Sequence, residues 1–224
     1  MRLIFLLVFA GALYGEPGAV NGGLYKPTFL LDSRSFSAGS AFLTRVAVGA
    51  HEDLVLVTCF HVLGDQPADI RAAVGLSMTQ PQVVVVGSRY LPIKSAHVIS
   101  GQSAAGEVAA FAVLNAPAMA PFLRLAVDAP RVGDRVHLFA RVVGATAPQL
   151  YAARVAVVTS DCLDYVLDDA GLELGGTSGA PVVNEKGEVI GINAAGAKID
   201  GRLHAYANPA GMFVPKIQDA LQSE

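Results

Sequence analysis

The feature that most constrains the fold is a succession of short β-type runs. Nine segments either alternate apolar and polar side chains or are continuously rich in β-branched residues, and turn signals such as "VGD", "NEKGE" and "KIDGR" separate several of them. The predicted strands cover residues 40–48, 53–60, 81–87, 107–114, 135–143, 151–158, 164–169, 180–184 and 188–195. This pattern predicts an all-β chain folded as antiparallel barrels or as a sandwich.

Two other segments organise these strands. The stretch "NAPAMAPF" (115–122) contains two prolines and divides the strands into two groups, and a length of 224 residues suits two halves that share an interface. The convincing helix signal is in the tail, where Ile217 and Leu221 stand four apart behind Pro215. We therefore predict a C-terminal helix over residues 215–223.

The N-terminus predicts export. In "MRLIFLLVFAGALYGEPG" an arginine precedes an apolar run, and a small-residue site follows, with cleavage after Ala12 or Gly15. A membrane span needs about 20 apolar residues, and this run is shorter. Residues 1–15 are thus interpreted as a signal peptide and 16–35 as an extended arm. We expect a secreted or periplasmic protein with no stable membrane insertion after cleavage.

Charge and cysteine content narrow the partners. The formal net charge is −3 and no basic run occurs, so we expect no nucleic-acid partner. The two cysteines, Cys59 and Cys162, could pair in an exported chain, but Cys59 lies in an apolar run where thiols usually pack as small hydrophobes. We favour two buried free thiols. Their spacing fits no metal site, and no cofactor is expected.

Two polar residues stand at the ends of apolar runs. His61 follows the strand "LVTCF", a position at which a histidine is ordinarily a partly buried structural residue. Glu107 opens "EVAAFAVL" and would ordinarily be a solvated strand-end acid. However, it is the only acidic residue between Asp69 and Asp128.

The segment "GGTSGAPVV" (175–183) places Ser178 among glycines. A nucleophilic serine needs a neighbouring base, and its tetrahedral intermediate needs backbone N–H donors. Flanking glycines allow a backbone turn in which such donors converge. A glycine-rich hairpin loop is the alternative, but it does not explain the proline and apolar strand that follow at once.

These three segments, in this order and spacing, resemble the trypsin-like serine proteases. The family's matching segments read T-A-A-H, D-[ILV]-A-x-[LF] and G-x-S-G-G-P, against "VTCFHVL", "EVAAFAV" and "GTSGAPVVN" here. The stretch "GEVIGINAAGA" resembles the strand that lines the substrate cleft, and "AGMFVPKIQDAL" resembles the ending of the bacterial HtrA/Deg-type branch. The likeness covers about residues 36–222. It implies two six-stranded Greek-key barrels, spanning about 36–117 and 122–212.

The resemblance also implies roles for residues. Ser178 would be the nucleophile, His61 the general base and acid, and Glu107 the carboxylate that orients His61. The oxyanion hole would consist of the N–H groups of Gly176 and Ser178. The function implied is a serine endopeptidase that acts on proteins or peptides through an acyl-enzyme.

The primary specificity pocket is implied only by resemblance. It would be bounded by the segment that begins at Leu172, by Ala194, Ala195 and Gly196, and by Gly211. Glu173 is near this set, but no charge is certain to lie at the floor. Small or apolar substrate side chains are therefore expected.

Three departures from the family pattern matter. Glutamate replaces the usual aspartate and is one methylene longer, and Ala180 replaces a glycine. Thr177 stands where digestive trypsins have the aspartate that pairs with a newly cut N-terminus, so we expect no zymogen cleavage. About ten residues follow "GMFVP", so no PDZ module is expected in this sequence.

Two alternatives compete with this interpretation. An α/β-hydrolase needs G-x-S-x-G followed by an acid and a histidine, but Ala180 replaces the second glycine, only Asp200 and His204 follow, and strands do not alternate with helices. A trypsin-like fold with an impaired triad could instead act as a binding or scaffolding module. Glu107 is the feature that favours the second alternative.

Overall fold

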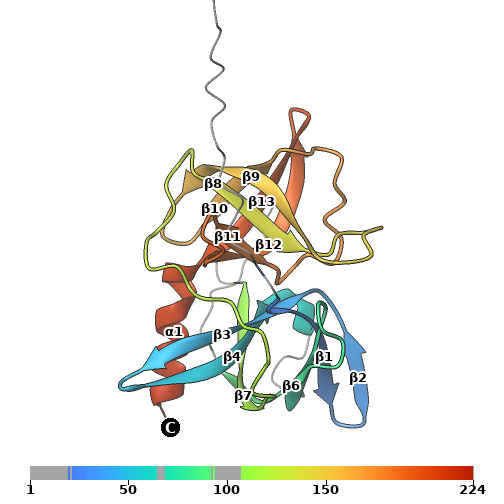
Figure 1. The fold of residues 1–224 in the computed structure, drawn as a ribbon, viewed down its shortest axis with the longest axis vertical. Helices are drawn as coiled ribbons and strands as arrows, with labels where there is room; N and C mark the ends of the chain where they lie inside the picture. The colour runs from blue at the N-terminus through green and yellow to red at the C-terminus, as the bar shows by residue number, and fades with distance from the viewer. Residues whose placement is uncertain (1–19, 21, 65–68, 92, 94–106, 224) are drawn as a thin grey trace, which may run out of the picture.

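The strands of the computed structural model form two closed antiparallel barrels, one above the other in Figure 1. The structure describes residues 20, 22–64, 69–91, 93 and 107–223. The prediction of an all-β chain made of two six-stranded Greek-key barrels with a C-terminal helix is confirmed.

The first barrel contains six strands with one additional hairpin strand. The ring runs β1-β3-β4-β7-β6-β5 and closes where β5 pairs with β1, while β2 pairs with β1 outside it. The strands are β1 (Leu24–Leu31), β2 (Arg34–Ser37), β3 (Ala41–Val48), β4 (His51–Cys59), β5 (Ala72–Ser77), β6 (Val84–Leu91) and β7 (Val108–Asn115). Successive side chains of a strand point to opposite faces, so every second one packs into the barrel. The second half of β3 shows this pattern, with every second residue buried.

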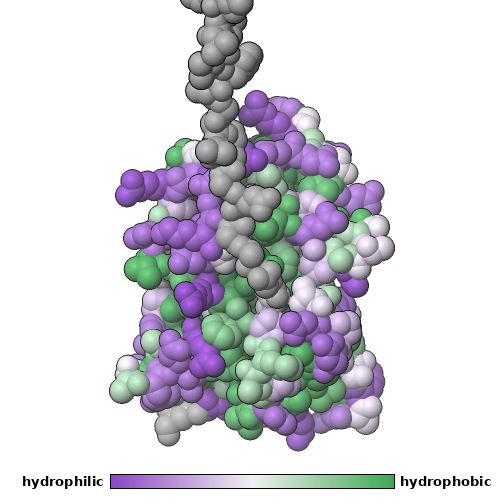
Figure 2. All heavy atoms as spheres, in the orientation of Figure 1, coloured by the Kyte–Doolittle hydropathy of each residue, from purple (hydrophilic) through white to green (hydrophobic). Residues whose placement is uncertain are grey.

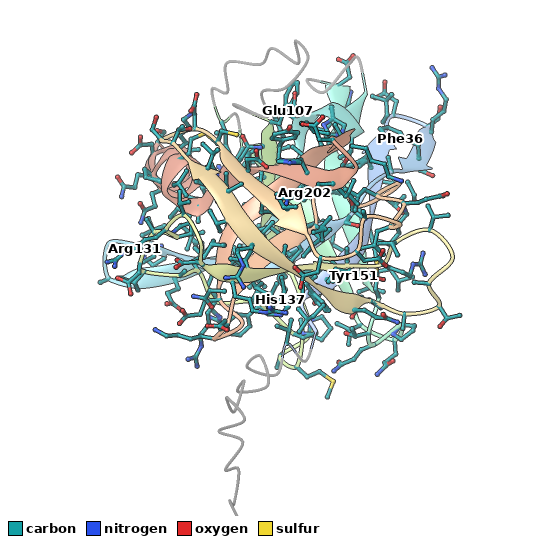
Figure 3. The ribbon with its side chains drawn as sticks, turned by 90° about the horizontal axis from the view of Figure 1, so that it is seen from above. Phe36, Glu107, Arg131, His137, Tyr151 and Arg202 are labelled. Atoms are coloured by element: carbon teal, nitrogen blue, oxygen red, sulfur yellow. The ribbon has the colours of Figure 1, made fainter. Side chains whose placement is uncertain are left out.

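The second barrel repeats the topology of the first. Its ring runs β8-β9-β10-β13-β12-β11 and closes where β11 pairs with β8. In each ring three successive strands are neighbours and the fourth lies beside the first, which is the Greek-key arrangement. His137 and Tyr151 belong to this barrel and lie well away from Glu107 (Figure 3). The strands are β8 (Arg135–Ala140), β9 (Gln149–Val158), β10 (Leu163–Leu167), β11 (Pro181–Asn184), β12 (Val189–Ile199) and β13 (Arg202–Pro209).

The predicted arm over residues 16–35 is wrong from Leu24 onward. Strand β1 is an integral part of the first barrel, and its Leu24, Tyr25 and Phe29 are fully buried. This strand was not predicted because Pro27 has no N–H to donate to a neighbouring strand, which argues against a central strand. Strands β2, β5 and β13 were also not predicted, since small, glycine-containing or polar residues weaken their β pattern.

The C-terminal helix begins earlier than predicted. Helix α1 spans Ala210–Gln222, so Pro215 lies inside it rather than at its start. Because a helix leaves its first four N–H groups without intrahelical partners, a proline in the second turn removes only one hydrogen bond near the end. Among the described residues, no helix has the length and apolar character needed to cross a bilayer.

The linker and α1 join the two barrels. In the linker, Leu123 forms a bridge to Thr44 of β3 and Leu125 forms one to Val189 of β12. Helix α1 leaves the second barrel and runs down beside the first (Figure 1), where the side-chain amide of Gln218 donates to the carbonyl of Ala47 over 2.9 Å. Hydrophobic side chains show at mid-height on this face (Figure 2). The linker and α1 thus tie the two barrels together.

Candidate active site

His61 is positioned by the end of a core strand. Strand β4 ends at Cys59, and the chain turns at once into a 3-10 helix, Phe60–Leu63, whose Val62 and Leu63 are buried. The backbone N–H of Phe60 donates to the carbonyl of Glu107 over 3.1 Å. The turn therefore projects His61 out of the first barrel, where 31% of its side chain remains exposed.

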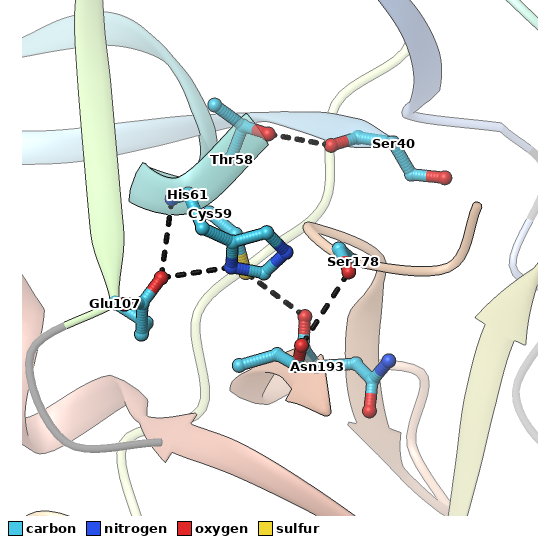
Figure 4. A network of polar contacts seen from close by, with 8 residues as sticks. Ser40, Thr58, Cys59, His61, Glu107, Ser178 and Asn193 are labelled. Carbon is cyan, nitrogen blue, oxygen red and sulfur yellow. Dashed lines mark hydrogen bonds and ion pairs between the residues drawn. The ribbon is translucent and has the colours of Figure 1, made fainter. Parts of the chain in front are cut away.

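Glu107 reaches His61 directly. The β4–β7 register pairs Cys59 with Val108, so Glu107 stands beside the turn that carries His61. One oxygen, Oε2, accepts hydrogen bonds from Nδ1 of His61 at 2.8 Å and from the backbone N–H of His61 at 3.1 Å. A carboxylate on Nδ1 places the ring proton there, which leaves Nε2 as an acceptor. Figure 4 shows the second ring nitrogen on the side of Ser178.

The Glu107 carboxylate lies in a buried environment. Only 3% of the residue is exposed. Removing a carboxylate from water is costly unless hydrogen bonds stabilise it, and charge-assisted bonds are the stronger kind. The two donors of His61 supply such bonds and keep the imidazole in one orientation.

Ser178 lies on a tight turn between β10 and β11. Gly179 follows it with φ of +89°, and a side chain there would clash with the carbonyl of Ser40 and with the hydroxyl of Thr58. Its N–H donates to the carbonyl of Asn193 over 2.8 Å. This turn therefore requires glycine.

The Ser178 hydroxyl is directed toward β12. Oγ donates to the carbonyl of Ala194 at 3.4 Å, a long contact, and the structure has no hydrogen bond between Oγ and His61. Ala194 sits at a bulge, because the β12–β13 register shifts between Asn193 and Ala195. The bulge turns the Ala194 carbonyl toward the serine.

Ser40 of the first barrel donates hydrogen bonds to the backbone carbonyls of Ser178 and Gly176. Its N–H donates to the Ser178 carbonyl at 2.7 Å, and its hydroxyl donates to the Gly176 carbonyl at 2.8 Å. Gly176 has φ of +80°. Within the described part of the chain, the N–H groups of Gly176 and Ser178 have no acceptor. The two donors predicted to form the oxyanion hole are thus available to a ligand.

A neutral polar network lies behind this turn. The hydroxyl of Tyr165 donates to Oδ1 of Asn193 at 2.7 Å, and Nδ2 of Asn193 donates to Oγ1 of Thr177 at 3.0 Å. Oγ1 of Thr177 donates in turn to the carbonyl of Leu174 at 2.7 Å. All three side chains are almost fully buried. The residue before the serine is therefore held without an ion pair.

Cys59 lies beneath the site as a buried thiol. Its Sγ donates to the carbonyl of Asn193 at 3.0 Å, across the boundary between the barrels (Figure 4). The pKa of this thiol is raised well above its usual range, mainly because the thiol is buried and also because the negative charge of Glu107 is near. Neither Cys59 nor Cys162 forms a disulfide, as predicted, but the expected burial holds only for Cys59, because Cys162 is partly exposed.

The structure brings together part of the predicted specificity pocket. Ala194 is buried, whereas Ala195 and Gly196 are exposed on β12 beside Ser178. The Leu174 side chain packs against Gly196, where an added Cβ would meet Leu174 Cδ1 at 2.5 Å, so the segment from Leu172 borders this edge.

Gly211 does not belong with these residues. It lies in the first turn of α1 and lines an apolar cavity with residues 125–130 and 158–160, none of which contributes to the site. The prediction placed Gly211 at the pocket by resemblance alone, and the structure contradicts it.

Several residues of the site carry no signal in the sequence. Ser40 and Tyr165 act through hydrogen bonds between distant segments and belong to no motif that we identified. Thr58 and Asn193 lie within the segments "VTCFHVL" and "GEVIGINAAGA", but the sequence assigned them no role. No group of three His, Cys, Asp or Glu side chains in the described ranges converges as a metal site would require.

Comparisons with known proteins agree with this geometry. Residues 39–192 match the family model described as the trypsin-like peptidase domain, which is more than half of the chain. A comparison with curated protein sequences gives no match.

Solved structures share the fold. The HtrA-type protease AlgW, solved with a decapeptide, superimposes with a TM-score of 0.60 at 14% identity, over 92% of this chain and 66% of that one. The serine endoprotease from Yersinia pestis gives 0.61 at 15% identity, over 90% and 64%. Neuropsin, a serine protease of mouse brain, gives 0.65 at 11% identity, over 93% and 99%. The chain thus spans slightly less than two thirds of each of the first two proteins. It belongs to the trypsin-like peptidase family.

Proposed function

We propose that this protein is a serine endopeptidase in which Ser178 is the nucleophile, His61 the general base and Glu107 the orienting carboxylate. The observation that carries the proposal is the 2.8 Å contact between Nδ1 of His61 and Oε2 of Glu107, with the opposite ring nitrogen on the side of Ser178. The family supports a peptidase but does not by itself establish activity in this chain.

The reaction would proceed through an acyl-enzyme. Nε2 of His61 takes the Ser178 proton as Oγ attacks the substrate carbonyl, and the N–H groups of Gly176 and Ser178 stabilise the oxyanion. The imidazolium then donates its proton to the departing amine as the peptide bond breaks. Water, activated by the same histidine, releases the acyl group and restores Ser178.

Before this reaction, the Ser178 side chain must rotate from its present rotamer toward His61. Oγ contacts the Ala194 carbonyl over a long 3.4 Å, so little free energy opposes its rotation about χ1 toward His61. Catalytic hydrogen bonds frequently tighten only when substrate binds. The rotation requires no movement of the backbone that Ser40 and Gly179 fix.

The substrate class is peptides or unfolded protein segments. The exposed residues Ala195 and Gly196 provide an edge for an extended peptide. The HtrA-type protease AlgW was solved with a decapeptide, which supports peptides as the substrate class. Because Leu174 lies against Gly196, the primary pocket is narrow. Small or apolar side chains are the proposed preference at the residue before the scissile bond.

We also propose that the protein acts after export, as its N-terminal sequence predicts. N-terminal sequencing of protein recovered from its native host should begin after Ala12 or Gly15. Recovery of a chain that still begins at Met1 would contradict this proposal.

A covalent probe tests the enzymatic proposal. A fluorophosphonate should label the purified protein at Ser178, and Ser178→Ala should abolish both labelling and peptide cleavage. The hydroxyl makes one long contact, so the free energy of unfolding should change by less than about 1 kcal/mol. Ser37→Ala, on the exposed strand β2, is the matched control and should retain both activities. Failure of the unaltered protein to react would favour the alternative, a binding or scaffolding module.

A further inference from the structure

A cationic cavity adjoins the proposed oxyanion hole. It has a volume of about 250 Å³ and lies between the barrels, bordered by Gly39 and Ser40 on one side and by Gly175 and Gly176 on another. Lys26 of β1 and Arg141, which follows β8, supply its charged groups. Each barrel therefore contributes one cation.

Lys26 is held in place by the backbone next to the site. The side chain is half-buried, and Nζ donates to the carbonyl of Gly39 at 3.0 Å. The following residue, Ser40, is the one that binds the Ser178 carbonyl. The ammonium group is thus fixed to the segment that positions the nucleophile.

Among the described residues, no carboxylate neutralises the positive charge of this cavity. Within the described ranges, neither Lys26 nor Arg141 forms an ion pair with a carboxylate. Burial and the Arg141 charge lower the pKa of the Lys26 ammonium, as expected for two cations that face each other. An anion bound between them would relieve both effects.

The cavity lies on the leaving-group side of Ser178. The acyl part of a substrate is assigned to the edge formed by Ala194 to Gly196, and none of those residues lines the cavity. Figure 4 shows Ser178 between Ser40 and Asn193, which precedes that edge. A peptide with its carbonyl at Gly176 therefore extends its departing segment toward Lys26 and Arg141.

We propose that this cavity binds a carboxylate carried by the leaving-group segment of the substrate. This inference rests on the proposed endopeptidase function and adds a preference after the scissile bond. The carboxylate has two possible sources, an acidic side chain one or two residues after the bond or the C-terminus of a short substrate. Both present the same group to the two cations.

A peptide series tests the preference and separates the sources. Peptides share one acyl segment and carry Asp, Asn or Ala at the first or second position after the bond, each with a free or an amidated C-terminus. Two ion pairs of surface strength predict a kcat/KM about fivefold to tenfold higher for Asp than for Asn. If the Asp-to-Asn ratio is near one and peptides with a free C-terminus are cleaved faster than their amidated forms, the C-terminus is the source.

Variants link the preference to the two cations. Lys26→Gln and Arg141→Gln should each reduce the Asp-to-Asn ratio, and the double variant should bring it to about one. Arg141→Glu should bring the Asp-to-Asn ratio below one, and a matching peptide with Lys at that position should then be cleaved faster than the Asn peptide. Lys186→Gln, which removes an exposed cation in the turn before β12, is the charge-matched control and should keep the ratio.

The outcomes distinguish this proposal from the proposed function. Cleavage by the unaltered protein with an Asp-to-Asn ratio near one and no preference for a free C-terminus would overturn the cavity proposal and leave the endopeptidase proposal standing. If no peptide is cleaved, binding of the fluorescent Asp and Asn peptides to Ser178→Ala is measured by anisotropy. Tighter binding of the Asp peptide, lost in the Lys26 and Arg141 variants, would support the carboxylate site, and equal binding would reject it.

Discussion

The backbone N–H of Ser40, in the first barrel, donates to the carbonyl of Ser178, in the second, over 2.7 Å. This bond crosses the boundary between the two barrels at the proposed nucleophile. His61 and Glu107 belong to the first barrel, so the relative position of the barrels determines whether base and nucleophile can meet. Ser40 couples the two halves at that point.

Glu107→Gln tests whether the carboxylate orients His61. Glutamine keeps the size of the side chain but offers an uncharged partner, and its amide favours the wrong ring tautomer. We expect turnover to fall about 10³- to 10⁴-fold with the fold retained, as is typical of triad carboxylates. Turnover of a peptide and circular dichroism are the measurements. Near-normal turnover would reduce the site to a His61–Ser178 dyad.

Glu107→Asp tests the length of the side chain. The Glu107 carbonyl is held by Phe60, so a shorter side chain withdraws the carboxylate by about 1.5 Å, one carbon–carbon bond. Misplacement of this size predicts a loss of about 10- to 100-fold in kcat. Equal or higher activity in Glu107→Asp would mean that the backbone moves to compensate.

Thr177→Val tests the neutral network behind the serine. Valine has the same shape but removes the two hydrogen bonds of the hydroxyl, to the Leu174 carbonyl and from Nδ2 of Asn193. We therefore expect kcat to fall about 10- to 100-fold with little change in KM. Thr44→Val is the matched control, because Thr44 is also buried and donates to the Leu123 carbonyl at 2.8 Å.

Both threonine variants should lose about 1–3 kcal/mol of stability, through buried polar groups left unsatisfied. Only Thr177→Val should lose turnover when both are assayed below their melting temperatures. Equal turnover in the two variants would assign the network a purely structural role.

Alkylation distinguishes the two thiols. The native protein should react only at Cys162, which is partly exposed, because Cys59 is buried and its pKa is raised. Denaturation without reductant should then expose the second thiol, for two labels in total by mass spectrometry. A mass with no label would show that the two cysteines pair in solution.

His137 predicts a loss of stability in mild acid. The ring is buried, and burial and the nearby Arg135 lower its pKa from the ordinary 6.5. The unfolded chain then takes up the proton before the folded chain does, so the free energy of unfolding decreases as the pH falls below about 6.5.

His137→Gln should weaken this dependence between pH 7 and 5, as measured by urea unfolding. His51→Gln, at an exposed position, is the control and should leave the dependence unchanged. A steeper dependence in His137→Gln than in the unaltered protein would contradict the assignment.

The sequence by itself determined the class of the fold and the three central residues. The alternation of apolar and polar side chains along a strand is a local property that the sequence shows directly. His61, Glu107 and Ser178 stand in short motifs whose order and spacing can also be recognised in the sequence. The two thiols were also predicted, since the apolar surroundings of Cys59 are visible in its neighbours along the chain.

Only the tertiary structure decided the remainder of the site. Strand β1 is stable despite Pro27 because the barrel buries Tyr25 and Phe29, which no local pattern reveals. Ser40, Asn193 and the Lys26–Arg141 pair act through contacts between segments more than 100 residues apart. The sequence could not determine whether the Glu107 carboxylate contacts His61, because this too is a contact between distant segments. It depends on where the β4–β7 register places two backbones, and that position is set by the packing of the whole barrel.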